Sequence, residues 1–129
     1  MPNRKRKLWG VLLGLTLTAP AMASPEGIWE IEMRDSRYAV SLCGDGTQLC
    51  AELIWLGNGA DNAENRPYLN TMLIDHAVPI GANSWKGELH VFGKSASGTI
   101  TQVSDDQITL RGCYLLVLCR TYRLYRYQP

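Results

Sequence analysis

The sequence lacks the short motifs by which many enzymes and cofactor-binding proteins are identified. It contains no Gly-x-Ser-x-Gly nucleophile motif and no phosphate-binding P-loop, and its two histidines, His76 and His90, lie far apart. The Cys-x-x-Cys spacing of thiol–disulfide catalysts is also absent. We therefore predict a protein that is not an enzyme and that carries no cofactor.

The sequence also has no apolar run long enough for a transmembrane helix, which needs about 20 such residues. The uncharged run from Leu8 to about Ala19 follows four positive charges, Arg4 to Lys7, and precedes the small-residue pattern Ala21-Met22-Ala23. This order is typical of a Sec-type secretory signal peptide. A buried helix of the folded domain is the alternative, and four adjacent charges fit it poorly. We expect cleavage after Ala23, so that residues 1–23 are removed and residues 24–129 form one periplasmic or secreted domain that does not span the membrane.

A concentration of positive charge is missing from the expected mature domain. Four of the 13 Lys and Arg residues and none of the 12 Asp and Glu residues lie before Ser24, which leaves 9 basic and 12 acidic residues and a net charge of −3. Binding to a phosphate backbone depends on a dense basic surface. Nucleic acid is therefore excluded as an expected partner.

Four cysteines are present, and an exported domain of this size is expected to use them in two disulfides. Cys43 and Cys50 flank a Gly-Asp-Gly turn, so a bridge across that hairpin is easy. Cys113 and Cys119 enclose five residues without a turn former, and a local bridge there needs a turn or bulge because a straight strand would hold the sulfurs about 20 Å apart. Cross-linking between the two pairs remains the alternative. Neither spacing is that of a zinc site, so no metal is expected.

Period-two alternation of apolar and polar residues recurs along the domain, as in Trp29, Ile31 and Met33 against Glu30 and Glu32. No segment after the leader shows the 3.6-residue period of a helix. The expected strands cover residues 27–33, 38–42, 49–56, 69–74, 85–92, 98–103, 107–112 and 119–127. We predict an all-β fold, an antiparallel meander closed as a small barrel or sandwich.

Several of these motifs appear in an order that resembles a known family. They are Gly27-x-Trp29, Cys43…Leu49-Cys50 leading into Ile54-Trp55-Leu56, Asp61…Asn65-Arg66-Pro67, Trp85-x-Gly87, Arg111-Gly112-Cys113 and Leu118-Cys119-Arg120…Tyr125-Arg126. The set is similar to the bacterial family of small exported proteins with domain of unknown function 2147 (DUF2147). The resemblance implies a lipocalin-like up-and-down β-barrel and no established activity. Ala96 stands where the family pattern has an aromatic residue, and Tyr125 stands where it has tryptophan.

The resemblance also implies a structural role for two residues. Lipocalin-like barrels have an early Gly-x-Trp and a late arginine that packs over the indole and closes one end of the barrel. Trp29 and Arg126 stand at these positions. We therefore expect a cation–π contact between them, worth about 0.5–2 kcal/mol.

Two functions from different classes fit the sequence. In the first, Trp29, Trp55 and Trp85 line a pocket for a small apolar or amphiphilic ligand, although each could instead be ordinary core. In the second, the protein is an envelope structural or protein-interaction module that binds an envelope partner through its C-terminal strand, which is rich in residues common at interfaces: Arg120, Tyr122, Arg123, Tyr125, Arg126 and Tyr127. An interior void of about 300 Å³ or more favours the first function.

Two groups of polar residues could suggest a catalytic or a calcium-binding site, and we interpret both as surface structure. Asp75 and His76 are neighbours in a segment that we interpret as a solvated loop, and on a strand their side chains would point to opposite faces. The polar loop 57–67 contains the densest group of oxygen ligands, Asp61, Asn62, Glu64 and Asn65. Its spacing does not match a calcium-binding EF-hand loop, and we interpret it as a surface turn.

Overall fold

The computed structural model describes residues 22–115 and 118–129, so most of the expected leader lies outside the described residues. The strands are β1 (Gly27–Ile31), β2 (Ser36–Cys43), β3 (Gln48–Leu56), β4 (Met72–Gly81), β5 (Ser84–Val91), β6 (Lys94–Ser104), β7 (Gln107–Tyr114) and β8 (Leu118–Arg126). A short 3-10 helix, η1 (Arg66–Tyr68), lies in the β3–β4 connection. Among the described residues, no helix has the length and apolar character to cross a membrane.

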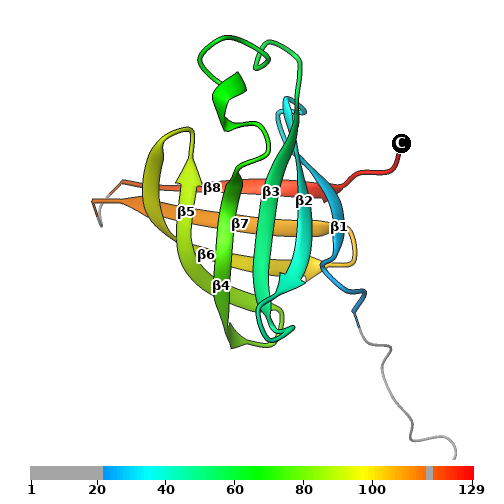
Figure 1. Ribbon diagram of the computed structural model, residues 1–129. Coiled ribbons are helices and arrows are strands. Elements are labelled where there is room, and N and C mark those ends of the chain that lie inside the picture. The colour runs from blue at the N-terminus through cyan, green and yellow to red at the C-terminus, as the bar shows by residue number, and fades with distance from the viewer. Residues whose placement is uncertain (1–21, 116–117) are drawn as a thin grey trace, which may run out of the picture.

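The strands form a closed antiparallel barrel in which each strand pairs with the next (Figure 1). β1 also pairs with β8, and Trp29 is the register partner of Arg126. Closure removes the free sheet edges at which chains would otherwise associate. The prediction of an all-β antiparallel meander is confirmed, and the closed form is the barrel, not the sandwich.

An up-and-down barrel places alternate connections at opposite ends. The turns β2–β3, β4–β5 and β6–β7 lie at the same end as the start of β1 and the close of β8, and we call this the Trp29 end. The connections β1–β2, β3–β4, β5–β6 and β7–β8 lie at the other end, which we call the loop end. The long β3–β4 connection with η1 projects from this end in Figure 1.

The core follows from the alternation along each strand. In β2 the side chains of Tyr38 and Val40 are buried while that of Ala39, between them, is half-buried, because successive side chains point to opposite faces of the sheet. Trp29, Leu49 and Ile100 are the largest of the fully buried side chains, and all three belong to the half of the barrel nearer the Trp29 end.

A close approach in the barrel wall depends on two glycines. Gly98 of β6 and Gly112 of β7 are register partners, and the side chain of Leu89 lies over both. A Cβ atom at Gly98 would stand 2.4 Å from Leu89 Cδ1, far inside van der Waals contact. The absence of side chains here lets Leu89 pack flat against the wall.

The fourth strand corrects one prediction. We expected residues 69–74 to be the strand and Asp75, His76, Pro79 and Gly81 to belong to a loop, whereas β4 continues to Gly81. His76 adopts a positive φ of 58°, and the pairing with β5 shifts register between Ile74 and Val78. This bulge lets the strand continue while it breaks the period of two.

The two disulfides join Cys43 to Cys50 and Cys113 to Cys119, which settles the connectivity that the sequence left open. Cys113 and Cys119 are register partners in the β7–β8 hairpin, and their Cα atoms lie 4.0 Å apart. The turn that a local bridge requires is present: Leu115 has a φ of 55°. Each bridge therefore locks one hairpin, at opposite ends of the barrel.

Candidate functional site

The barrel contains a cavity of about 660 Å³ that opens at the loop end. Its deeper wall is formed by apolar side chains of several strands, including Ile31, Leu73, Leu89, Leu110 and Leu124. The four leucines are buried and Ile31 is partly buried, and all five side chains point inward. The volume lies within the range of about 300–1,000 Å³ typical of small-molecule sites.

Two polar side chains interrupt this apolar wall. Ser36 and Tyr38, both buried, line the cavity, and the Ser36 hydroxyl donates a hydrogen bond of 3.1 Å to the Tyr38 hydroxyl oxygen. Burial raises the pKa of Tyr38, an effect that the bond from Ser36 partly opposes. The phenol is therefore neutral in the ordinary pH range, and its own O–H remains able to donate to an acceptor in the cavity.

The mouth of the cavity carries charged groups. Lys94, at the start of β6, and Arg120, in β8, line it and are exposed, whereas Asp35 of the β1–β2 connection is half-buried. Long basic side chains pack their methylene groups on apolar surface while the charge stays in water. A ligand with an apolar body and a polar end would meet both kinds of surface here.

The opposite end of the barrel is closed by Trp29 and Arg126. The guanidinium carbon of Arg126 lies 4.4 Å from the centre of the Trp29 ring, so the predicted cation–π contact is present. The guanidinium also donates to the backbone carbonyl oxygens of Ser24, Glu26 and Asp105, at 2.8–2.9 Å. Gly27, with a φ of 140°, permits this approach, because a Cβ atom there would stand 2.8 Å from Arg126 Nη1.

The other two predicted tryptophans occupy different surroundings. Trp85 is buried at the Trp29 end, where its ring nitrogen donates to the carbonyl oxygen of Thr47 in the β2–β3 turn. Trp55 is half-buried and lies beside an outer groove that also includes Glu30 and Arg37. None of the residues Trp29, Trp55 and Trp85 lines the interior cavity. Trp29 and Trp85 instead fill the half of the barrel beneath it.

The outer groove contains a stacked arginine. The Arg37 guanidinium carbon lies 3.7 Å from the centre of the Trp55 ring and 3.8 Å from that of Tyr127. Its Nε donates to Glu30 Oε2 at 2.8 Å. The cluster joins β1, β2 and β3 to the segment after β8, and stacking on aromatic faces is a role for which arginine is better suited than lysine.

This cluster gives a prediction about acid stability. The hydrogen bond from Arg37, opposed by partial burial and helped by Arg34, lowers the pKa of Glu30. The folded pKa is therefore below the unfolded value, so the stabilisation is complete above the unfolded pKa and is lost as pH falls through the folded one. Between about pH 5 and pH 3, Glu30→Gln should lose less stability than the wild type, as measured by urea unfolding. Parallel curves for the two proteins would contradict this.

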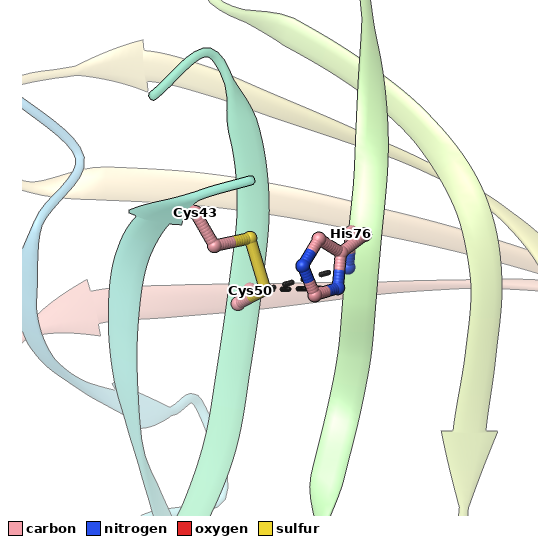
Figure 2. A group of neighbouring side chains, drawn as sticks. All are labelled: Cys43, Cys50 and His76. Atoms are coloured by element: carbon pink, nitrogen blue, oxygen red, sulfur yellow. Dashed lines mark hydrogen bonds between the residues drawn. A yellow bond between two sulfur atoms is a disulfide. The ribbon is translucent and has the colours of Figure 1, made fainter. Parts of the chain in front are cut away.

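His76 lies against the Cys43–Cys50 disulfide (Figure 2). Its Nδ1 is 3.7 Å from Cys50 Sγ, and its backbone N–H donates to the same sulfur at 3.4 Å. On a regular strand Asp75 and His76 would point to opposite faces, but the bulge places Asp75 Oδ1 2.6 Å from His76 Nδ1. The carboxylate and the sulfur therefore face the same ring nitrogen. A catalytic triad needs them on different nitrogens, so this geometry is not that of a triad.

The polar β3–β4 loop uses its oxygen atoms internally. Asp61 Oδ1 accepts a bond of 2.7 Å from Arg66 Nε, and Asn62 Oδ1 accepts one of 2.9 Å from the backbone N–H of Asn65. Within the ranges 22–115 and 118–129, the grouping of metal-ligand atoms is Cys43, Cys50 and His76, and both sulfurs are held in the disulfide. His90 is exposed near the end of β5, with its Nδ1 3.2 Å from Ser95 Oγ.

Sequence reasoning placed Tyr38 in the expected strand 38–42 but did not identify it as a site residue. The signal was available, since a tyrosine at a core position needs a partner for its hydroxyl. Ser36, two residues earlier and on the same face, supplies that partner. The pair supplies polar groups in a cavity that none of the three predicted tryptophans lines.

Comparisons with known proteins agree with this architecture. A search of curated proteins gave no match. Among solved structures, protein HP1028 from the human pathogen Helicobacter pylori, described as belonging to the lipocalin family, is similar with a TM-score of 0.61 and 17% identity, over 82% of this chain and 84% of that chain. At that identity the likeness shows the fold alone, a lipocalin-like barrel. Residues 27–126 match a family described as an uncharacterized protein conserved in bacteria (DUF2147). The chain therefore belongs to the bacterial DUF2147 family, as its ordered motifs predicted.

Proposed function

We propose that the protein is an exported carrier or receptor for a small apolar or amphiphilic molecule, which it holds in the cavity at the loop end. The observation that carries the proposal is the cavity itself, about 660 Å³ in volume and lined mainly by apolar side chains. This is more than twice the void of about 300 Å³ that separates a binding barrel from a filled one. The lipocalin-like fold supports the same function.

The cavity suggests how such a molecule would be held. Its apolar part would replace water against Leu73, Leu89 and Leu110, which gains free energy in proportion to the apolar area buried. An acceptor atom on the molecule would take the hydrogen bond that the Tyr38 O–H can donate. The charged groups at the mouth would face a polar end of the molecule. Binding of this kind requires no covalent change in the ligand.

A fluorescence titration tests the proposal. N-phenyl-1-naphthylamine, an apolar dye that brightens when it leaves water, should bind the protein and be displaced by decan-1-ol. Binding to a cavity would saturate at one dye per barrel. Absence of any saturable binding of the dye or of the alcohol would contradict the proposed function.

The role of Tyr38 gives a sharper prediction. Tyr38→Phe removes the hydroxyl and keeps the ring, so it should weaken binding of decan-1-ol by about 2- to 10-fold, the value of one hydrogen bond. Binding of the dye should change by less than about twofold, since burial of its apolar rings does not depend on that hydroxyl. Equal weakening of both compounds would show a general loss of the cavity and would contradict this role.

The envelope structural or interaction module stays as the second candidate, because the C-terminal strand exposes polar and aromatic side chains. Tyr125 is 45% exposed on β8. Tyr127 and Arg37, in contrast, are already used in contacts within the barrel. The cavity favours the binding function over this alternative.

A further inference from the structure

The β7–β8 hairpin ends in apolar side chains that the barrel does not cover. Tyr114, Leu115 and Leu118, which we call the apolar tip, are 49%, 70% and 63% exposed. Leu115 is the most exposed of the large apolar side chains described. Isolated exposed apolar residues are common on proteins, but a group of them at the end of one hairpin indicates an interaction site.

The apolar tip is held in place and lies at the cavity mouth. The Cys113–Cys119 disulfide joins the two strands directly below it. Tyr114 and Leu118 also line the cavity, as does Met33, which is 50% exposed in the β1–β2 connection. The exposed apolar surface is therefore continuous with the apolar interior.

The two strands that carry the apolar tip have charges of one sign. From Gln107 to the C-terminus the sequence contains four arginines and no acidic residue, although the expected mature domain is acidic overall. Arg111 and Arg120, both exposed, lie just below the tip on the two strands, and Lys94 lies at the same mouth. The acidic group in the cavity lining, Asp35, is half-buried.

The apolar tip lies next to Arg111, Arg120 and Lys94, which we call the basic collar. This combination matches the surface of a bilayer that contains anionic lipids. Apolar side chains enter the boundary between headgroups and acyl chains, while lysine and arginine remain at the level of the phosphates. A protein partner would have to offer an apolar pocket ringed by acidic groups. The bilayer offers both properties without a special shape.

We propose that the apolar tip docks the protein on anionic membrane surfaces, with the cavity mouth facing the bilayer. The docking proposal depends only on the exposed apolar tip and the basic collar. Exchange of an apolar molecule between bilayer and cavity, without passage through water, rests in addition on the proposed function.

Flotation with vesicles tests the docking. The oxidised protein should float with vesicles of equal parts phosphatidylglycerol and phosphatidylcholine, and less with phosphatidylcholine alone. Leu115→Asp with Leu118→Asp should reduce the bound fraction on anionic vesicles by about tenfold or more, because charge replaces the inserted groups. Lys94→Gln with Arg120→Gln should abolish the preference for the anionic lipid.

A matched control separates docking from folding and from the cavity. Val78 and Ile80, 49% and 54% exposed in β4 near the Trp29 end, form a second exposed apolar pair away from the mouth. Val78→Asp with Ile80→Asp should bind vesicles like the wild type. Leu115→Asp alone, at the tip residue that does not line the cavity, should weaken flotation and still bind N-phenyl-1-naphthylamine. Loss of dye binding in every protein would contradict the proposed function and leave the docking result unaffected.

Three results would overturn the docking. The wild type could fail to float with anionic vesicles, or the tip variant and the wild type could float equally. Sedimentation could also show a dimer that the tip variant dissociates, in which case a second copy of the chain covers the apolar tip and not a membrane.

Discussion

Replacement of Trp29 by alanine is expected to destabilise the protein by about 3–5 kcal/mol, the usual cost of truncating a buried aromatic side chain. Trp29 is completely buried, its ring nitrogen donates to the carbonyl oxygen of Pro25 at 2.8 Å, and Arg126 packs over its face. The substitution therefore opens a void and removes the support of the guanidinium at once. Guanidinium-induced unfolding with the disulfides intact gives the measurement.

Trp55→Ala is the matched control for this effect. Trp55 is half-buried and stacks on Arg37 by a cation–π contact of the same type, but it lies outside the packed interior. Its loss should cost about 2 kcal/mol or less. If the two substitutions destabilise the protein equally, Trp29 is not the main packing residue of the closed end.

Ala96→Trp is expected to abolish binding of the dye, with at least a tenfold loss of affinity, while the barrel remains folded. Ala96 lines the cavity and is the register partner of Leu89, whose buried side chain points inward. An indole attached there would occupy space that the ligand requires. It would not have to displace packed atoms, since the space is open, so the usual cost of overpacking does not apply.

Ala39→Trp provides the control for the cavity-filling variant. Ala39 lies between the inward-facing Tyr38 and Val40 and therefore faces outward, where it is half-buried. The same change of residue at this position should leave the affinity for the dye unaltered. Equal affinity of the Ala96→Trp protein and the wild type would place the bound dye outside the cavity.

Much of the fold could be predicted because it depends on local patterns. Period-two alternation gave the strands, and the Gly-x-Trp and late arginine gave the pair that closes the barrel. Gly27 shows why this pattern is informative: its missing side chain is the space that Arg126 occupies. Both disulfides are local to hairpins, so their cysteine spacing already limited the possibilities.

The bulge at His76 could not be predicted, since a positive φ at a histidine has no signature in the sequence. Its consequence was large, because it brought the side chains of Asp75 and His76 together and let the strand continue to Gly81. A proline at position 79 argued for a loop, yet Pro79 lies in β4 beside a second shift of register.

The location of the candidate site could not be predicted from the sequence, for a different reason. Apart from Glu52, the segment from Leu49 to Leu56 is apolar on both faces, so the alternation that assigns side chains to the interior does not distinguish Trp55 from its neighbours. The cavity is a property of the volume left between eight strands. Trp29 and Trp85 fill one half of the barrel, and the small residues Ala96 and Gly112 leave space in the other.

Native mass spectrometry of the protein produced from its full sequence and purified under native conditions, beside its Ala96→Trp variant, tests the central claim most directly. The wild type should carry an additional small-molecule mass that disappears under denaturing conditions, and the variant should be bare. Bare wild-type protein that also gains no mass from added decan-1-ol would contradict the account, as would the same adduct on both proteins.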